Sequence, residues 1–96
     1  MMPFSTQVVE KESIPSFRFD YREVLDSEEA RARREAQLMR AISMGNTYRR
    51  KVNITFATVD GLKTVRTTVW ATTRTHLILK NGIHIPICTV KELVPE

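Results

Sequence analysis

The sequence predicts a mainly β protein with one helix, built as a small antiparallel barrel of about five strands preceded by an amphipathic helix. Three observations lead to this fold class. Residues 28–44 contain neither Gly nor Pro and are rich in good helix formers. The apolar period changes to two from residue 52 onward. The pairs Asp60-Gly61 and Asn81-Gly82 each predict a tight hairpin turn.

Length and composition restrict the kind of protein. Ninety-six residues allow one domain with a thin core. The hydrophobic fraction of 42% and the charged fraction of 27% are those of an ordinary soluble protein. No apolar run approaches the length of a membrane span, and the N-terminus lacks the pattern of a secretory signal. Cys88 is the only cysteine, so we expect a reducing, cytoplasmic location and no membrane partner.

The net charge of +4 is unevenly distributed. Residues 1–35 carry six basic and eight acidic groups, whereas residues 36–96 carry nine basic and three acidic groups. The positive field therefore belongs to the second part of the chain, where it favours an anionic partner. A surplus of this size also occurs in proteins that bind no polyanion, and the sequence leaves both interpretations open.

The N-terminal part, residues 1–25, is predicted to be a flexible segment, with residues 26–96 forming the single helix-plus-barrel domain. Pro3 and Pro15 interrupt any regular element there, and no apolar period is sustained. Within this segment, the alternation over residues 17–21 is compatible with one added strand.

The helix is predicted to begin at Asp26, since Glu29 three residues later completes a capping box. Gly45 is predicted to stop it. Its first part, where Arg and Glu alternate, reads as a solvated face. The part expected to dock on the sheet carries three apolar residues at helical spacing: Leu38, Met39 and Ile42.

Two-residue turns would fix the register of both hairpins. Around Asp60-Gly61, the predicted inward pairs are Phe56 with Val65, Ile54 with Thr67, and Val52 with Val69. The opposite face then holds Thr55 with Arg66, Asn53 with Thr68, and Lys51 with Trp70.

Around Asn81-Gly82, the predicted pairs are Ile78 with Ile85, His76 with Ile87, Leu79 with His84, and Leu77 with Pro86. Both faces of this hairpin are largely apolar, which predicts a curled sheet plugged by the end of the helix. A last short strand is expected around residues 90–94.

The sequence contains no recognisable set of catalytic or metal-binding residues. The predicted register places His76 and His84 on opposite faces, where they would not share a metal ion. Cys88 stands four residues after His84, about 13 Å along a strand at ~3.3 Å per residue, too far for a proton transfer. No phosphate loop, dinucleotide fingerprint or nucleophile elbow occurs. We expect a non-enzymatic protein without cofactor, metal or small-molecule substrate.

One constellation of residues is basic and aromatic. Cations beside an exposed aromatic ring suit single-stranded nucleic acid, because phosphates pair with the charges and bases stack on the ring. The structural alternative is that Trp70 packs under the helix and the cations are merely solvated. The candidate residues for binding RNA or single-stranded DNA are Arg49, Arg50, Lys51, Lys63, Arg66, Trp70 and Arg74.

A second function class stays open beside nucleic-acid binding. The chain would then be a protein–protein interaction or homo-oligomeric assembly module that uses unpaired sheet edges and the charged half of the helix. Salt dependence separates the two, because counterion release makes nucleic-acid affinity fall steeply as salt rises.

The order of helix, strand, turn, longer strand, hairpin and final strand over residues 28–94 resembles Sm-like barrels, including the bacterial RNA chaperone type, and more widely SH3-like small barrels. The chain is also similar to a group of short uncharacterised bacterial proteins through the runs RRKVNITF, DGLKTVRTTVWATT and LILKNGIHIPI. The resemblance implies a small barrel. Arg66 stands about where Sm-like proteins carry a second Gly in their bent strand, and their RNA-contacting residues have no counterparts here.

Overall fold

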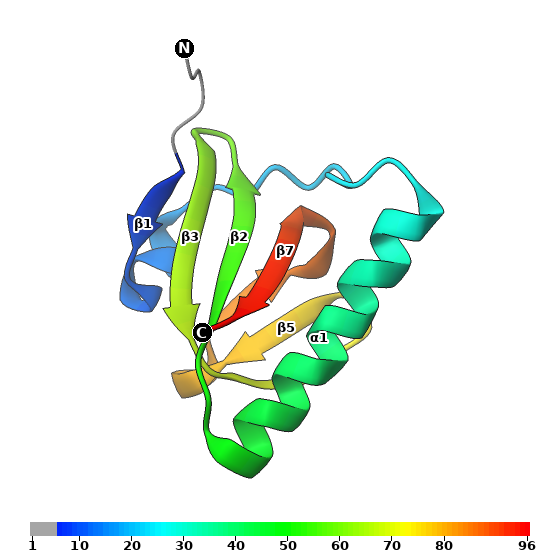
Figure 1. Cartoon of the computed structure of the whole chain (residues 1–96). Helices are drawn as coiled ribbons and strands as arrows, with labels where there is room; N and C mark the ends of the chain where they lie inside the picture. The colour runs from blue at the N-terminus through cyan, green and yellow to red at the C-terminus, as the bar shows by residue number, and fades with distance from the viewer. Residues whose placement is uncertain (1–5) are drawn as a thin grey trace.

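The computed structural model of the chain describes residues 6–96 and shows a mainly β domain with one long helix (Figure 1). The mainly β, single-helix prediction is therefore confirmed. Three short 3-10 turns accompany the helix and the strands. In chain order the elements are β1 (Gln7–Val9), η1 (Lys11–Ser16), α1 (Glu28–Tyr48), β2 (Val52–Thr58), β3 (Gly61–Thr67), β4 (Val69–Thr72), β5 (His76–Leu79), η2 (Lys80–Gly82), β6 (His84–Pro86), η3 (Ile87–Thr89) and β7 (Val90–Pro95).

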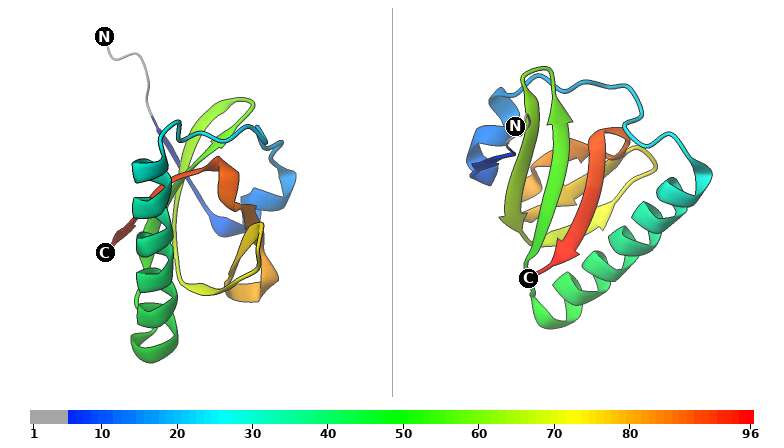
Figure 2. Two further views of the ribbon diagram at one scale, coloured as in Figure 1. Left: turned by 90° about the vertical axis from the view of Figure 1, so that its right-hand side faces the viewer. Right: turned by 45° about the horizontal axis from the view of Figure 1, so that its top comes forward.

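The described strands form two sheets, so they do not close into one barrel. The first sheet has the order β1-β3-β2-β7 and the second the order β4-β5-β6. Only Thr68 separates β3 from β4, so the chain passes from one sheet into the other at this point. The second sheet lies behind the first, and α1 contacts β7 and β4 (Figures 1 and 2). About five antiparallel strands were expected, whereas residues 6–96 form seven strands and β1 runs parallel to β3.

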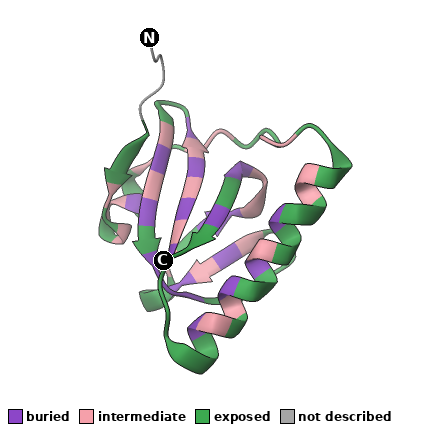
Figure 3. Cartoon of the chain, viewed as in Figure 1, coloured by how far each residue is buried: buried purple, intermediate pink, exposed green. Residues whose placement is uncertain are grey.

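The core lies between the two sheets and the helix. Buried residues alternate with less buried ones along β2 and β3 and recur on α1 (Figure 3). Phe56, Val65 and Val69 are each at most 1% exposed, which confirms the predicted inward face of the first hairpin. The buried apolar residues are Ile14, Leu38, Ala41, Val52, Ile54, Phe56, Val65, Val69, Leu77, Leu79, Ile85, Val90 and Leu93.

Both predicted ends of the helix were wrong. The N-cap is Ser27, whose hydroxyl accepts a hydrogen bond from the Ala30 backbone N–H at 3.0 Å, so the helix begins one residue later than the Asp26 signal indicated. Gly45 does not stop the helix but lies buried within it. A Cβ on Gly45 would meet the Val69 carbonyl oxygen at 2.5 Å, so the glycine is there because α1 and β4 approach closely.

The docking face of the helix differs from the expected one. Leu38 is buried as predicted, and Ala41 joins it, but Met39 is 52% exposed. Arg34, assigned to the solvated face, is buried and donates hydrogen bonds to both carboxylate oxygens of Glu23 at 2.7 Å and to the Val90 carbonyl at 3.0 Å. The spacing of apolar residues does not predict a buried guanidinium, because such burial depends on hydrogen-bond partners elsewhere in the fold.

The first hairpin is displaced by two residues from its predicted register. Thr58 faces Gly61, and Phe56 faces Lys63 instead of Val65. The Thr58 hydroxyl accepts from the Asp60 N–H at 3.1 Å and donates to the Gly61 carbonyl at 2.9 Å, which places the two loop positions at residues 59 and 60. A shift of two keeps each side chain on its face, so the inward set was right although the pairs were wrong.

The second hairpin is displaced by one residue. Asn81 and Gly82 adopt positive φ values of 70° and 76°, as the turn prediction required, but Lys80 joins them in a three-residue loop. The Leu79 N–H therefore bonds the Ile83 carbonyl at 2.7 Å. An odd shift changes which side chains share a face.

This shift corrects the prediction that both histidines lie on opposite faces. Leu77 now faces Ile85 in the core, while His76 faces Pro86 and His84 faces Ile78. Both imidazoles project from the outer face of the hairpin, with ring centroids 6.0 Å apart.

Part of the N-terminal segment is built into the domain. β1 pairs with β3, Ile14 of η1 is 1% exposed, and Phe19 forms an isolated bridge with Thr58. Residues 17–21 were compatible with a strand, but they form only this isolated bridge. The first five residues of the expected flexible segment, Pro3 included, lie outside the described part of the chain.

Among residues 6–96, no helix is long and apolar enough to cross a membrane. The one long helix, α1, carries charged residues through its first three turns.

Candidate nucleic-acid interface

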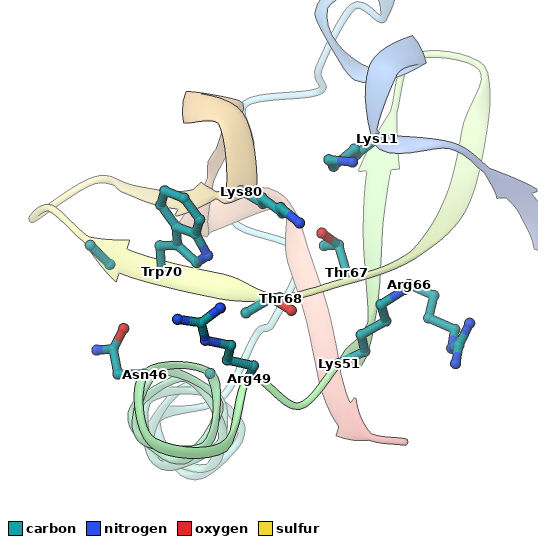
Figure 4. Close-up of a pocket in the computed structure, with 11 residues that line it drawn as sticks. Lys11, Asn46, Arg49, Lys51, Arg66, Thr67, Thr68, Trp70 and Lys80 are labelled. Carbon is teal, nitrogen blue, oxygen red and sulfur yellow. The ribbon is translucent and has the colours of Figure 1, made fainter.

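A groove of about 740 Å³ opens where the end of α1 meets the bend between β3 and β4 (Figure 4). Lys51 just before β2, the η2 turn and the first residue of η1 complete its walls. Its lining residues are Lys11, Gly45, Asn46, Arg49, Lys51, Arg66, Thr67, Thr68, Trp70, Ala71 and Lys80.

The lining contains five cationic side chains and no carboxylate. Two of the cations already have ion-pair partners, Lys11 with Glu12 at 2.9 Å and Arg66 with Glu96. The Lys11 hydrogen bond is the main reason why the pKa of the Glu12 carboxyl lies below its usual value of 4.5. The ion pairs among residues 6–96 do not involve the other three cations, which are Arg49, Lys51 and Lys80.

Arg49 is positioned by the way the helix ends. It adopts a left-handed conformation, with φ of 56°, and its N–H bonds the Gly45 carbonyl at 3.1 Å. This 5→1 bond is that of the αL C-cap motif, and the Arg50 N–H also reaches the Met44 carbonyl at 3.3 Å. This conformation costs roughly 1–2 kcal/mol for a residue other than glycine. It turns the chain toward β2 and leaves the Arg49 side chain directed into the groove (Figure 4).

Trp70 provides the aromatic wall of the groove. Val69 is fully buried in the core, so its neighbour Trp70 faces outward from β4. The Trp70 side chain remains 49% exposed and lies beside Lys80 and Arg49 (Figure 4). An exposed indole among cations leaves a free π-face on which a planar group can stack.

The guanidinium of Arg66 points away from the centre of the groove toward its rim (Figure 4). There it pairs with the Glu96 carboxylate, while the Glu96 N–H bonds the Lys51 carbonyl at 3.1 Å. Arg66 therefore extends the positive surface beyond the groove, and an anion that binds it must displace Glu96.

Two cations of the groove were missed by sequence reasoning. Lys80 is held there because its backbone N–H bonds the Thr68 carbonyl at 3.3 Å, a contact between segments twelve residues apart. Lys11 reaches the groove through η1, in a segment expected to be flexible. No local pattern signals either lysine, because each depends on a long-range contact.

Three of the predicted binding residues lie outside the lining. Lys63 is buried, with its ammonium 2.6 Å from the Gln7 side-chain oxygen and 5.6 Å from the centre of the Phe17 ring. Arg50 and Arg74 are exposed but do not border the groove. The structure thus brings together four of the seven predicted residues: Arg49, Lys51, Arg66 and Trp70.

The electrostatics of the groove are dominated by the side chains. The carbonyl end of α1 also faces this region and contributes roughly half a negative charge. Five whole positive charges outweigh that contribution, even after Glu12 and Glu96 offset two of them. The net field in the groove is therefore positive and favours an anionic ligand.

The lining of the groove consists of ammonium, guanidinium, amide, hydroxyl and aromatic groups. It contains no imidazole, thiol or carboxylate that would transfer a proton near neutral pH. Comparison with protein-family models, with curated proteins and with solved structures found no match to this chain.

Proposed function

We propose that this protein is a non-enzymatic binding module for single-stranded nucleic acid, RNA or single-stranded DNA. The observation that carries the proposal is one groove in which Trp70 stands among five cations and no carboxylate lines the wall. Phosphate groups pair with the cations, and a base stacks on the indole. Each such stack contributes about 1–3 kcal/mol.

The need for a free π-face favours a single strand over a duplex. A base that stacks on Trp70 must leave its neighbours, and this costs least where the strand is already unpaired. Arg49, Lys51 and Lys80 serve as the primary phosphate contacts because they have no competing ion pair among the described residues. Arg66 and Lys11 act at the two rims.

We also propose that the chain is related to Sm-like or SH3-like barrels and that it is a bacterial, cytoplasmic protein. The proposed relationship is supported by the path of the chain from β3 through Thr68 into β4, which links two sheets by one bent segment. The sequence resemblance to such barrels points the same way. A cytoplasmic location would give the groove access to single-stranded RNA.

The proposal is tested by fluorescence anisotropy with labelled mixed-sequence RNA and DNA oligonucleotides at low salt. We expect Arg49→Glu and Lys80→Glu each to weaken binding about tenfold, since each variant replaces a phosphate contact by repulsion. Lys91→Glu is the matched control, because it changes the net charge equally at an exposed position of β7 outside the groove. Its affinity should stay within about twofold of the parent at equal salt.

Absence of measurable binding at low salt overturns the proposal, and so does an equal loss with Lys91→Glu. The second result would show attraction to the overall charge instead of the groove. Raising the salt gives a further check. With three phosphate contacts, the slope of log affinity against log salt should be about −2.

The second function class, a protein-interaction or assembly module, receives less support from the sheet edges. Of the four edge strands, β1 and β6 have three residues each, β4 has four, and β7 is covered by helix side chains. Short and covered edges disfavour pairing with another chain. A concentration-dependent dimer in sedimentation, together with no affinity for oligonucleotides, would favour this alternative.

A further inference from the structure

We infer that the outer face of the β5–β6 hairpin holds a two-histidine site for a borderline divalent metal ion such as Zn²⁺ or Ni²⁺. His76 faces Pro86 and His84 faces Ile78, so the two imidazoles are diagonal neighbours across the strands. Their ring centroids lie 6.0 Å apart, with an interplanar angle of 51°. This site is distinct from the groove and does not rest on the proposed function.

The separation of the rings is close to that of a chelate. Metal–nitrogen bonds of about 2.1 Å place the ring centroids roughly 4.6 Å apart at an N–metal–N angle of about 90° and roughly 5.3 Å apart at a tetrahedral angle. The observed separation is 6.0 Å. It exceeds the tetrahedral value by roughly 0.7 Å, so the two rings must approach each other by that amount when they bind one ion. Imidazole nitrogen is a preferred ligand of Zn²⁺, Ni²⁺ and Cu²⁺.

The ring of His76 is held by its neighbour. The Thr75 hydroxyl lies 2.8 Å from Nδ1 of His76, which fixes the ring and leaves Nε2 to face a ligand. Metal-binding histidines commonly have such a partner on the second ring nitrogen, because it sets the tautomer and the orientation.

The backbone that carries the two histidines is anchored. Leu77 and Ile85, which alternate with them along β5 and β6, face each other in the core and are fully buried. The two imidazoles therefore project from a fixed backbone, and binding one ion needs to order only their side-chain torsions. Among residues 6–96, no group of three or more His, Cys, Asp or Glu is placed to hold a metal. The remaining positions on the ion are thus left for water or an added ligand.

Titration calorimetry with Zn²⁺ on the full chain tests the site. We expect one ion per chain, with the affinity reduced about 100-fold in both His76→Gln and His84→Gln, since each variant turns a chelate into a single contact. Cys88→Ser is the control, because it removes the only thiol and should leave Zn²⁺ affinity unchanged. Both histidine variants alter outer-face side chains, so circular dichroism should show the parent fold.

The chain contains only two histidines, which makes the outcome decisive. Parent affinity in either histidine variant overturns the site, as does loss of binding in Cys88→Ser. The oligonucleotide affinity of the histidine variants should equal that of the parent, so failure of the metal site and failure of the groove are observed separately.

Discussion

At the residue scale, the absence of a side chain at Gly45 allows α1 to approach the start of β4 closely. Gly45 lies within α1, yet glycine usually lowers helix stability by about 1 kcal/mol relative to alanine. The Val69 carbonyl and the Thr68 side chain leave no room for a Cβ at this point, at 2.5 and 3.0 Å. The close approach also forms part of the groove wall, since Gly45 and Thr68 both line it.

We predict that Gly45→Ala lowers the free energy of unfolding by about 1–3 kcal/mol, because overpacking against a backbone carbonyl exceeds the gain in helix propensity. Urea denaturation measures the change. Ser43→Ala, at an exposed position on the same helix, should stay within about 0.5 kcal/mol of the parent. A Gly45→Ala variant that is more stable than the parent would show that the contact with β4 is loose.

The ion pair between Arg34 and Glu23 is the second residue-scale feature. The Arg34 hydrogen bonds hold the pKa of the Glu23 carboxyl below its usual 4.5, against the opposing effect of burial. The folded protein therefore binds this proton less readily than the unfolded chain does. Stability from the pair is complete above pH 4.5 and is lost as the pH falls through the folded-state pKa.

We predict that Glu23→Gln destabilises the protein by about 1–3 kcal/mol near neutral pH, because it leaves the buried Arg34 without a counter-charge. The difference between parent and variant should shrink as the pH is lowered below 4.5. Denaturation curves of both proteins across the acid range measure this difference. A gap that is constant with pH would mean that the carboxylate charge contributes nothing.

At the element scale, α1 covers the open edge of the first sheet. β7 pairs with β2 on one side only. On its other side, the Arg34 guanidinium donates to the Val90 carbonyl at 3.0 Å and the Gln37 side-chain oxygen accepts from the Leu93 N–H at 3.0 Å. Helix side chains thus satisfy backbone groups that would otherwise offer an edge to another chain.

We predict that Gln37→Ala speeds hydrogen exchange of the Leu93 amide and lowers the free energy of unfolding by about 1 kcal/mol. Gln37→Glu is the matched control, because a carboxylate oxygen still accepts from this N–H. Exchange measured by NMR should therefore stay slow in the Glu variant. Equal protection in Gln37→Ala and the parent would contradict the role of the side chain.

The hairpins show which part of an element the sequence was able to predict. Positive φ at Asn81 and Gly82 follows from their residue types, and the inward alternation around Phe56 follows from its period. The registers did not follow, because each depended on one additional residue. The Thr58 hydroxyl bonds moved the first turn by one residue, which shifts its pairing by two, and the inclusion of Lys80 in the loop shifted the second pairing by one.

At the scale of the whole molecule, the groove combines parts of the chain that are far apart in sequence. Arg49, Lys51, Arg66 and Trp70 were predictable because local alternation places them at a strand entrance or on an outer face. Lys11 and Lys80 were not predictable, since only tertiary contacts bring them in. Lys63 was misassigned for the same reason, because the parallel pairing of β1 with β3 encloses it.

The groove contains an intrinsic fluorescent probe, the indole of Trp70. Trp70 is the only tryptophan in the chain, so intrinsic tryptophan fluorescence observes this one wall. The central claim is that bases stack on Trp70 while cations hold the phosphates. It is tested most directly by titrating a short single-stranded oligonucleotide and an abasic strand of equal length while the fluorescence is recorded.

We predict saturable quenching by the oligonucleotide and about a tenfold weaker affinity for the abasic strand, since one stack contributes roughly 1–3 kcal/mol. Trp70→Phe keeps a ring and should retain most of the anisotropy-measured affinity, whereas Trp70→Ala should lose it. Fluorescence that does not change while the oligonucleotide binds, or equal affinity for the abasic strand, would contradict the account.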